Sequence, residues 1–504
     1  AATWRSRSAI PLRSVSAWHD GAGTVSGRIP LLDPSPGPAG QGRLSPKAFS
    51  GEVVPFGVTA FREGHDLIGV QLRLFSPAGD ESLHRLTPLD DGFDHWRTDV
   101  AVLAQGDWSF RFEAYADDIA TWLHAADLKI AAGVDTEVMT LMGVRLLERA
   151  AAERDRPAAQ RTALRRWAVS LQAAGPDGAL AIVRDGELAA VFRERPLMSL
   201  VSVGGDLTLR VERERAGVGA WYEFFPRSEG AARRADGSVR SGTFRTAAKR
   251  LAAVAEMGFQ VVYLPPIHPI GHTNRKGPNN TLVADSGDPG SPWAIGDASG
   301  GHDAVHPDLG TLADFRAFVR RARTAGLEVA LDLALQASPD HPWVHTHPEW
   351  FTTLPDGSIA FAENPPKKYQ DIYPINFDND PDGIRAEVLR IVQHWIAQGV
   401  RIFRVDNPHT KPLWFWEWLI RTVTAEDPDV VFLAEAFTRP APLHALARVG
   451  FQQSYSYFTW RNTKGELAEF LDGVAQETAD FLRPNLFVNT PDILTEYLQF
   501  GGPA

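Results

Sequence analysis

The sequence predicts an α/β protein in which an immunoglobulin-like β-sandwich, carrying a helical insert, precedes a (β/α)8 TIM barrel that stops after its seventh strand. Three observations predict this fold. Apolar residues alternate with polar ones over residues 50–116, recur every three or four positions over 117–193, and from residue 218 gather into short strands separated by helices. These are the periods of strands, of amphipathic helices and of repeated β-α units.

Composition narrows the class of protein. The 504 residues are 44% hydrophobic and 22% charged, which is typical of a globular chain of roughly three domains. The absence of cysteine excludes disulfides, thiolate metal sites and cysteine nucleophiles. We find no apolar run of about 18 residues and no signal-peptide pattern, so we expect a cytoplasmic protein without a membrane span. The net charge of -11, with no dense Lys/Arg cluster, argues against a nucleic-acid partner.

The N-terminal part is predicted to contain an arm and a sandwich. Residues 1–48 are rich in Pro, Gly, Ser and Arg, which predicts a flexible arm with one short apolar island at 27–32. Residues 49–116 alternate as strands do, and the alternation returns over 194–216, so both segments are assigned to one β-sandwich. The residues that show the alternation best are Val70, Leu72 and Leu74, and Trp108, Phe110 and Phe112.

Residues 117–193 are predicted to form three or four amphipathic helices inserted in the sandwich. Leu164, Trp167 and Leu171 are spaced as one helical stripe. A second stripe is expected to bury Val138, Leu141, Met142 and Leu146 together.

Residues 217–504 are predicted to form the barrel. One helix should begin at Thr311, whose partner Asp314 makes a capping-box signal, and end before Gly326. Another should cover 382–399 with Ile384, Val388, Ile391, Val392 and Trp395 on its buried side. We find no eighth strand before Ala504, so we expect the barrel to be incomplete. The seven expected strands are Val218–Phe225, Val261–Leu264, Leu327–Leu333, Val400–Val405, Val430–Leu433, Phe451–Tyr457 and Asn485–Val488.

Two connections are too long to be simple loops. One runs from Pro265 to about Gly310, and the other is expected to form a loop domain over 336–381. Both leave the carboxyl ends of strands, where barrels carry their active sites.

Three carboxylates follow three predicted strands on that same face. Asp406 follows strand four, Glu435 strand five and Asp492 strand seven. Two carboxylates across a bond, one nucleophilic and one proton-donating, are what retaining glycosyl transfer requires, and a third can stabilise the positive charge that develops. Arg404 lies two residues before Asp406 and so points to the same side of its strand, where it can hold the carboxylate ionised.

These residues resemble the four short signature regions of the α-amylase superfamily of glycoside hydrolases. The matching positions are Asp332, Arg404-Val405-Asp406, Glu435 and Asp492. The resemblance implies a retaining double displacement, with Asp406 as nucleophile, Glu435 as general acid/base and Asp492 as transition-state stabiliser.

Departures from the usual amylase pattern indicate one branch of the superfamily. The sequence reads Asp332-Leu-Ala-Leu-Gln-Ala where amylases carry Asn-His after the aspartate, and Thr490-Pro-Asp where they carry Asn-His-Asp. With the long motifs that begin at Trp221, Leu264 and Arg275, these departures resemble the α-1,4-glucan:maltose-1-phosphate maltosyltransferases. The resemblance implies maltose 1-phosphate as donor, the non-reducing end of an α-1,4-glucan as acceptor, no cofactor and no metal, and a homodimer through the N-terminal domains.

A donor phosphate beside several carboxylates needs positive charge to offset the repulsion. The segment Asn364-Pro-Pro-Lys-Lys-Tyr-Gln-Asp371 carries suitable lysine, tyrosine and amide donors. The resemblance implies that the phosphate is held by Asn364, Lys367, Tyr369 and Asn407. It implies that the sugars contact Lys276, Gln336 and Asp371, with Arg404 and Ser291 in the same pocket.

Two alternative functions remain open. One is hydrolysis by an amylase-type enzyme, and the other is a non-catalytic glucan-binding barrel. His345 and His347 are interpreted as ordinary loop histidines, because no further ligands lie at metal-binding spacing. The aromatic run Trp414-Phe-Trp-Glu-Trp418 is interpreted as helix packing in preference to a glycan platform.

Overall fold

The computed structural model describes residues 27–37, 46–235 and 238–501. They divide into two compact units, one containing 27–37 with 51–210 and the other 46–50 with 211–501. Most of the expected N-terminal arm, residues 1–26 and 38–45, lies outside the described residues.

The first unit contains two antiparallel sheets. One has the strand order β1-β3-β7-β6; the other contains β10-β8-β4-β5, with β9 also paired to β8. The predicted alternation is confirmed in β4 and β8, whose apolar members are buried, and Phe56 of β3 packs edge-on against Phe110 of β8 at 5.1 Å. The strands are β1 (Leu31–Ser35), β3 (Glu52–Ala60), β4 (Ile68–Phe75), β5 (Glu81–Arg85), β6 (Thr87–Pro88), β7 (His95–Val102), β8 (Gly106–Asp117), β9 (Met198–Val203) and β10 (Leu207–Glu212).

Strand β1 falls within the segment that we expected to be an arm. Leu31 pairs with Ala60 and Leu32 with Thr59 of β3, so the apolar island at 27–32 leads directly into a sheet. The proline and polar residues of this segment led us to predict an arm, but they form a short edge strand. Proline is tolerated there because one side of an edge strand needs no partner.

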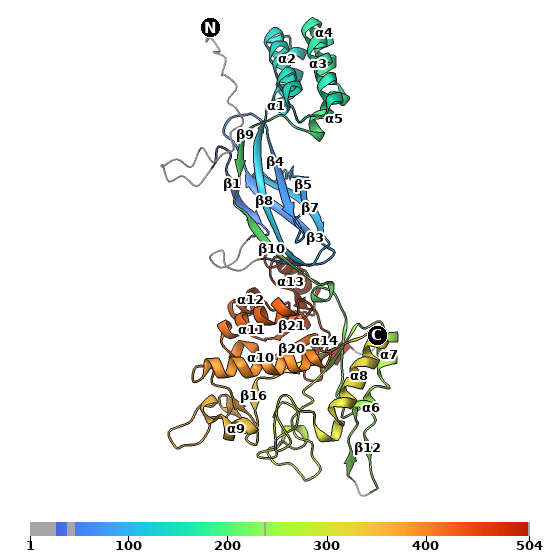
Figure 1. The fold of residues 1–504 in the computed structure, drawn as a ribbon, viewed down its shortest axis with the longest axis vertical. Coiled ribbons are helices and arrows are strands. Elements are labelled where there is room, and N and C mark those ends of the chain that lie inside the picture. Colours follow the sequence, from blue (N-terminus) through green and yellow to red (C-terminus); the bar gives the residue numbers. More distant parts are fainter. Residues whose placement is uncertain (1–26, 38–45, 236–237, 502–504) are drawn as a thin grey trace. The chain divides into compact units, whose positions relative to one another are not determined.

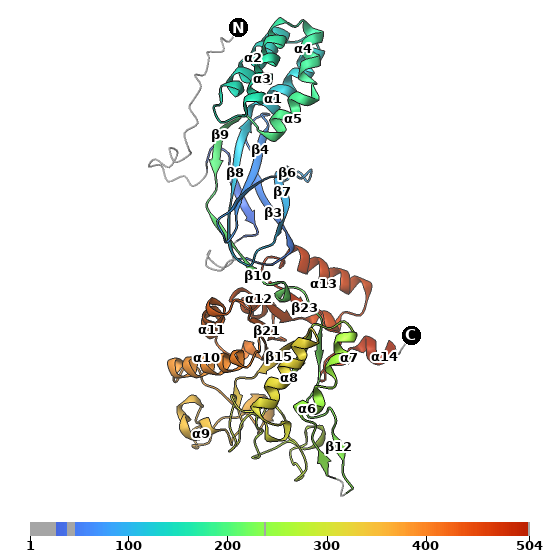
Figure 2. The same cartoon turned by 45° about the vertical axis from the view of Figure 1, so that its right-hand side comes forward.

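The helical segment of the first unit has five helices, where three or four were expected (Figures 1 and 2). The additional break has a local cause. Gly175-Pro176 starts a helix with proline at its first turn, and the Asp185 side chain caps the next by accepting from the backbone N–H of Glu187. The helices are α1 (Asp118–Ala131), α2 (Thr136–Ala152), α3 (Ala158–Ala173), α4 (Pro176–Val183) and α5 (Gly186–Glu194).

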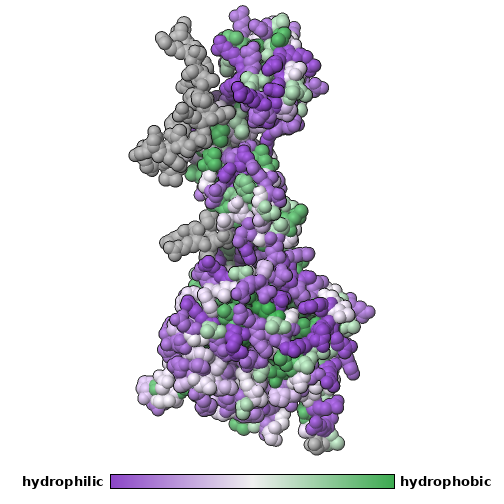
Figure 3. All heavy atoms as spheres, viewed as in Figure 1, coloured by the Kyte–Doolittle hydropathy of each residue, from purple (hydrophilic) through white to green (hydrophobic). Residues whose placement is uncertain are grey.

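The buried stripe of α3 is confirmed. In α2, Met142 and Leu146 of the predicted face pack partly buried against the core, but its other two members do not. Val138 and Leu141 remain 54% and 53% exposed, and α2 instead buries Met139, Val144 and Leu147. The cause is Trp122 of α1, whose indole N–H donates to the Met139 carbonyl at 2.8 Å. Gly143 gives this ring room, since a Cβ there would lie 2.1 Å from it. Hydrophilic residues cover most of the visible face of the helical segment in Figure 3.

The second unit contains a seven-stranded parallel sheet in the order β11-β14-β15-β20-β21-β22-β23. All seven predicted strands are present, and Val261–Leu264 has the predicted bounds. The first, sixth and seventh strands are shorter than predicted, and the seventh ends at Asn485, the partner of Tyr455 at the end of β22. The strands are β11 (Trp221–Glu223), β14 (Val261–Leu264), β15 (Glu328–Leu333), β20 (Ile402–Asp406), β21 (Val431–Glu435), β22 (Gln453–Tyr455) and β23 (Pro484–Asn485).

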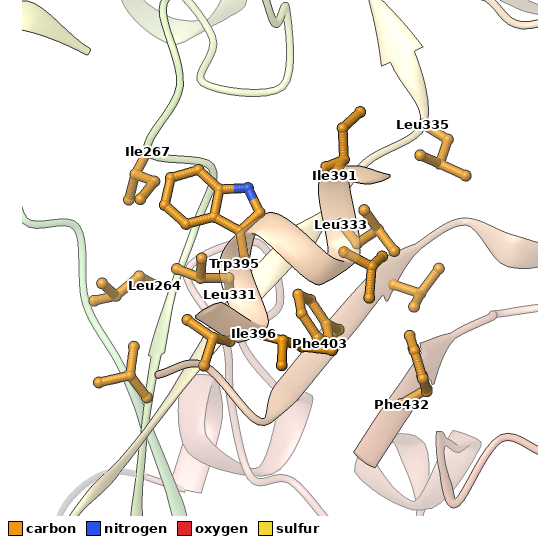
Figure 4. Packing of buried hydrophobic residues seen from close by; sticks show 14 of the residues in the cluster. Leu264, Ile267, Leu331, Leu333, Leu335, Ile391, Trp395, Ile396, Phe403 and Phe432 are labelled. Atoms are coloured by element: carbon orange, nitrogen blue, oxygen red, sulfur yellow. The ribbon is translucent and has the colours of Figure 1, made fainter. Parts of the chain in front are cut away.

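Helices cover the outer side of this sheet. In Figure 4, Leu331, Leu333 and Phe403 of the strands pack against Ile391 and Trp395 of α10. The predicted capping box at Thr311 and Asp314 is present, and the predicted stripe of α10 is buried. The helices are α6 (Phe244–Ala247), α7 (Leu251–Glu256), α8 (Leu312–Thr324), α10 (Pro381–Ala397), α11 (Leu413–Glu426), α12 (Pro440–Arg448), α13 (Lys464–Gln476) and α14 (Glu496–Gly501).

The aromatic run on α11 belongs to this packing. Phe415 and Trp416 are fully buried, and Trp414 and Trp418 lie against the core with the Arg385 guanidinium over both rings. The packing interpretation is therefore confirmed.

The two long connections carry short elements. The first holds η3 (Pro278–Asn280) and η4 (Pro307–Leu309). The second holds the strand pairs β16 (Gln336–Ala337) with β19 (Tyr373–Pro374) and β17 (Ala362–Asn364) with β18 (Lys367–Tyr369), together with α9 (Pro342–Thr346) and η5 (Pro348–Trp350). The remaining short elements are β2 (Lys47–Phe49), η2 (Glu214–Ala216), β12 (Ala232–Arg233), β13 (Val239–Arg240), η6 (Pro408–Thr410) and η7 (Tyr457–Trp460).

A search of the described residues for a helix long and apolar enough to cross a membrane finds none.

Candidate active site

Alternate residues of the parallel strands face opposite sides of the sheet. The outer side joins the large core shared with the helices. The inner side has its own small cluster, formed by Trp221, Val261, Tyr263, Ala330, Ile402 and Val431. Asp332, Arg404 and Glu435 lie an even number of residues beyond members of that cluster, so they continue the inner side toward the carboxyl ends of the strands.

Arg404 is the centre of the site. Its Nη1 donates to Asp332 Oδ2 at 2.9 Å and to Asp406 Oδ1 at 3.0 Å, while its Nη2 lies 3.4 Å from Glu435 Oε1. The guanidinium is buried, and the rings of Tyr263 and Tyr455 flank it, each with its centroid 5.7 Å away. One cation therefore gathers carboxylates from three neighbouring strands.

The surroundings raise the pKa of two of these carboxyls, Glu435 and Asp332. Burial raises the pKa of Glu435, although the charge of Arg404 opposes the shift. Burial also raises the pKa of Asp332 to about 7, again against Arg404. Tyr263 donates its hydroxyl to Asp332 Oδ2 at 2.5 Å. A raised pKa keeps Glu435 protonated more of the time near neutrality, which suits a general acid.

Asn407 connects the end of β20 to Glu435. Its backbone is in the left-handed region, with φ 43° and ψ 52°. Its N–H points at Glu435 Oε2 at 3.3 Å. Its carbonyl accepts from the Thr410 hydroxyl at 2.8 Å and from Lys411 Nζ at 3.2 Å.

Lys411 is a site residue that our sequence reasoning missed. Its Nζ lies 3.4 Å from the backbone carbonyl of Asp406, and burial lowers its pKa against the attraction of Asp406, Glu435 and Asp332. The only signal in the sequence was its position five residues after Asp406.

Asp492 is held less closely in the site than Asp406 and Glu435. It is exposed in a bend after β23, and its charge contributes to the raised pKa of Glu435. The structure thus brings Asp406, Glu435, Arg404 and Asn407 into direct contact, with Asp492 as an electrostatic neighbour.

The residues expected to bind sugars take part in hydrogen bonds between the first long connection and the second. Lys276 Nζ donates to Gln370 Oε1 at 2.8 Å, and its charge lowers the pKa of Asp371, which burial raises. Gln336 Nε2 donates to the Trp293 carbonyl at 3.2 Å.

Trp293 links this loop region to the carboxylates. Its indole N–H lies 3.3 Å from Asp332 Oδ2, and its backbone N–H lies 3.4 Å from the Ser291 hydroxyl. Sequence reasoning did not single out this tryptophan, because a lone indole carries no signal of the carboxylate that it contacts.

Three of the four expected phosphate-binding residues lie on the β17–β18 hairpin, and the fourth, Asn407, directly follows β20. Asn364 pairs with Lys367, and Lys367 Nζ lies 4.8 Å from the centroid of the Tyr369 ring. Lys367 is exposed. Within the described residues, no hydrogen bond or ion pair joins this hairpin to Asp406 or Glu435.

His345 and His347, interpreted from the sequence as ordinary loop histidines, lie in and directly after the short helix α9. Across residues 27–37, 46–235 and 238–501, no three His, Cys, Asp or Glu side chains group as metal ligands would. His347 stacks on Trp350 and contacts Glu349, as a loop histidine does.

Comparisons with known proteins point to a single family. The profile of the N/S domain of α-1,4-glucan:maltose-1-phosphate maltosyltransferase matches residues 27–213. An α-1,4-glucan:maltose-1-phosphate maltosyltransferase 1 of Streptomyces coelicolor is 54% identical over 484 residues, covering 95% of this chain and 70% of that protein. The enzyme of the same name from Mycobacterium tuberculosis is 49% identical over 507 residues, covering 95% and 72%. Among solved structures, an α-amylase from Lactobacillus plantarum is 26% identical, with a TM-score of 0.41 over 52% of this chain and 61% of that one.

Proposed function

The chain belongs to the α-1,4-glucan:maltose-1-phosphate maltosyltransferases, a branch of the α-amylase superfamily, and on that premise we propose how its site works. The enzyme is a glycosyltransferase that moves a maltosyl group from α-maltose 1-phosphate to the non-reducing end of an α-1,4-glucan and releases phosphate. The observation that carries the catalytic assignment is the Arg404 guanidinium shared by Asp406 and Glu435.

In the first half-reaction Asp406 attacks C1 of the donor. The bond between C1 and the phosphate oxygen breaks, an ester between Asp406 and C1 forms, and the proton of Glu435 passes to the leaving phosphate. The contact with Arg404 holds the Asp406 carboxyl in position. Asp492 stabilises the positive charge that develops on the sugar.

In the second half-reaction the acceptor 4-hydroxyl attacks C1. Its proton passes to Glu435, the ester to Asp406 breaks, and both carboxyls return to their starting states. Asn364, Lys367, Tyr369 and Asn407 hold the phosphate. Lys276, Gln336, Asp371 and Ser291 position the sugars.

The domain assignment and the assembly are proposals too. The seven parallel strands are the first seven of a (β/α)8 barrel over 217–504, with a loop domain at 336–381. An immunoglobulin-like sandwich over 49–116 and 194–216 carries the helical insert 117–193. The protein acts in the cytoplasm as a homodimer through its N-terminal domains.

Acceptor dependence tests this function. The full-length protein is given α-maltose 1-phosphate with and without a maltooligosaccharide, and both phosphate and chain length are measured. We expect phosphate release only with acceptor, and one maltosyl unit added per phosphate. Release of phosphate and free maltose at a similar rate without acceptor would indicate an amylase-type hydrolase. Glucan binding without turnover would indicate a non-catalytic barrel.

A further inference from the structure

A cavity of about 540 Å³ lies among the helices of the second unit, between α8, the turn that follows α10 and the residue that follows α11. This volume is typical of sites for small molecules. Although the chain has a net charge of -11, four arginines line the cavity and only one carboxylate does. The charged residues are Arg316, Arg320, Arg323, Arg401 and Asp427.

Three of these arginines form one stripe on α8. Arg316, Arg320 and Arg323 are spaced by four and by three residues, so they share a face of the helix. Like charges at these spacings repel one another and destabilise a helix. Arg320 and Arg323 are exposed, and among residues 27–37, 46–235 and 238–501 neither of them pairs with a carboxylate. The one acidic residue of α8, Asp314, caps the helix and pairs with Arg245 instead.

The turn after α10 holds two of these guanidinium groups in place. Arg316 Nε donates to Gln398 Oε1 at 2.6 Å, and Gln398 Nε2 donates to the His394 carbonyl at 2.8 Å, which fixes the orientation of the amide. Gly399 has φ 98°, a left-handed conformation that ends the helix at this point. Arg323 Nη2 lies 3.5 Å from the position that a Cβ on Gly399 would take, so this guanidinium lies against the turn.

Arg401 adds a fourth guanidinium from the other side of the cavity. Its Nη1 donates to the carbonyls of Ile396 at 2.8 Å and Val400 at 2.9 Å. Its Nη2 lies 3.7 Å from Asp427 Oδ1, which is the single carboxylate of the lining. One carboxylate cannot neutralise four guanidinium groups, so the cavity keeps an excess of positive charge.

The cavity is separate from the carboxylate site. Arg401 directly precedes β20 and Asp406 is the last residue of that strand, so they lie at opposite ends of it, about 16 Å apart. A donor whose reacting carbon lies at Asp406 therefore does not place its phosphate among these arginines. This group of cations forms only in the fold, because Arg401 follows α10 and the others lie on α8.

We propose that this cavity binds a small molecule that carries two adjacent phosphate groups. The planar guanidinium group donates two parallel hydrogen bonds to phosphate oxygens, which makes arginine the residue best suited to phosphate recognition. Several guanidinium groups in one cavity can engage more oxygens than a single phosphate offers to one side. An anion bound there would also relieve the repulsion along the α8 stripe.

The test is calorimetric titration of the full-length protein with pyrophosphate, orthophosphate and ADP at about 0.15 M salt, where general surface attraction is largely screened. We expect one pyrophosphate per chain and weaker binding of orthophosphate. The double variant Arg320→Met, Arg323→Met should bind pyrophosphate roughly tenfold to a hundredfold more weakly. Replacing the same two residues by lysine, which keeps the charge, should cost less.

Arg321→Met is the matched control. Arg321 is the neighbour of Arg320 on α8 and is also exposed, but it does not line the cavity, so this variant should bind pyrophosphate as the wild type does. ADP binding at least as tight as that of pyrophosphate would support the site with an ester of diphosphate as its ligand. Much weaker ADP binding would support it with inorganic pyrophosphate as its ligand.

Three results would overturn the inference. The first is a wild type that does not bind millimolar pyrophosphate, which needs no variant and so does not depend on the folding of one. The second is wild-type affinity in the double methionine variant, which would place the anion elsewhere. The third is an equal loss in Arg321→Met, which would show that the helix attracts anions only through its general charge.

Discussion

Asp406 and Glu435 are direct register partners at the ends of the neighbouring parallel strands β20 and β21. Neighbouring strands lie about 4.8 Å apart, and both side chains continue to the same guanidinium. This arrangement favours the separation of about 5–5.5 Å that retaining enzymes use over the wider one of inverting enzymes. A product whose new linkage keeps the α configuration, measured by NMR during turnover, would agree with this geometry.

Removing Asp406 and removing Glu435 should impair the reaction in different ways. Asp406→Ala should abolish phosphate release, because no nucleophile replaces it. Glu435→Ala should lose about 10²–10⁴-fold with maltose 1-phosphate and much less with a donor whose leaving group needs no proton. With such a donor and no acceptor, a maltosyl ester should accumulate on Asp406 in the Glu435→Ala variant and be visible by intact-protein mass. Near-normal turnover by Asp406→Ala would show that the nucleophile is another residue.

Elements set by local chemistry were predictable from the sequence. The run Val261–Leu264 is buried throughout, so its apolar residues mark the strand bounds. The helix that begins after Thr311 carries its own capping signal. The face of α2 was not predictable, because Val138 and Met139 are both apolar and only the position of Trp122 decides which is buried.

The candidate active site likewise contains residues that the sequence predicts and residues that it does not. Asp406 and Glu435 were predictable because carboxyl ends of parallel strands meet at one edge, which is a local rule. Lys411 was missed because its role depends on the turn after β20, which brings its ammonium group to the Asn407 carbonyl. A lysine in a loop carries no signal of its own.

Lys411 should act through the turn at Asn407. Lys411→Met removes a charged donor to the Asn407 carbonyl, so kcat/KM should fall roughly tenfold to a hundredfold. Thr410→Val removes a neutral donor to the same oxygen and should cost roughly fivefold. Steady-state kinetics of both variants checks the order, and a larger loss in Thr410→Val would show that the charge of Lys411 is not what matters.

Arg404 should control stability as well as catalysis. Arg404→Met leaves Asp332, whose side chain is fully buried, without its cation, which should cost about 3–5 kcal/mol at pH 8. The charge of Arg404 now lowers the pKa of Asp332, so the variant should raise that pKa above about 7. A carboxyl whose folded pKa exceeds its unfolded value of about 3.9 contributes stability below that value and loses it as pH rises through the folded pKa. Denaturant unfolding should therefore show a smaller deficit at pH 5 than at pH 8, and an equal deficit at both would contradict this account.

A buried pair of hydrogen-bonded histidines, one in each of the two long connections, should make the protein sensitive to acid. His341 Nδ1 accepts from the Trp343 N–H, so His341 Nε2 carries the proton toward His302 Nδ1 at 3.1 Å, and His302 Nε2 donates to the Ala334 carbonyl at 2.8 Å. Burial lowers the pKa of His302 to about 4 and of His341 to about 2. Both folded values lie below the unfolded value of about 6.5, so their stabilisation is complete above that pH and is lost as pH falls toward the folded values.

The free energy of unfolding should fall by about 1.4 kcal/mol per histidine for each pH unit below about 6.5. Unfolding curves at pH 7, 6 and 5 measure it. His302→Gln should lower stability at pH 7 and flatten the decline toward pH 5. The control His345→Gln changes an exposed histidine of the second long connection, which also carries His341, and should keep the wild-type decline. A decline unchanged in His302→Gln would show that other groups cause the acid sensitivity.

The β17–β18 hairpin should distinguish an anionic donor from a neutral one. Lys367→Ala and Tyr369→Phe should lower kcat/KM for maltose 1-phosphate far more than for maltosyl fluoride, by roughly tenfold to a hundredfold for a lost charge-assisted hydrogen bond. Lys368→Ala is the matched control, since Lys368 is the next residue of the same strand, is also exposed, and is paired with Glu363 at 3.1 Å. Because Lys367 is exposed, raising the salt concentration should weaken the Lys367→Ala effect strongly. Equal losses on both donors would mean that these residues only shape the hairpin, and the phosphate would then be bound elsewhere.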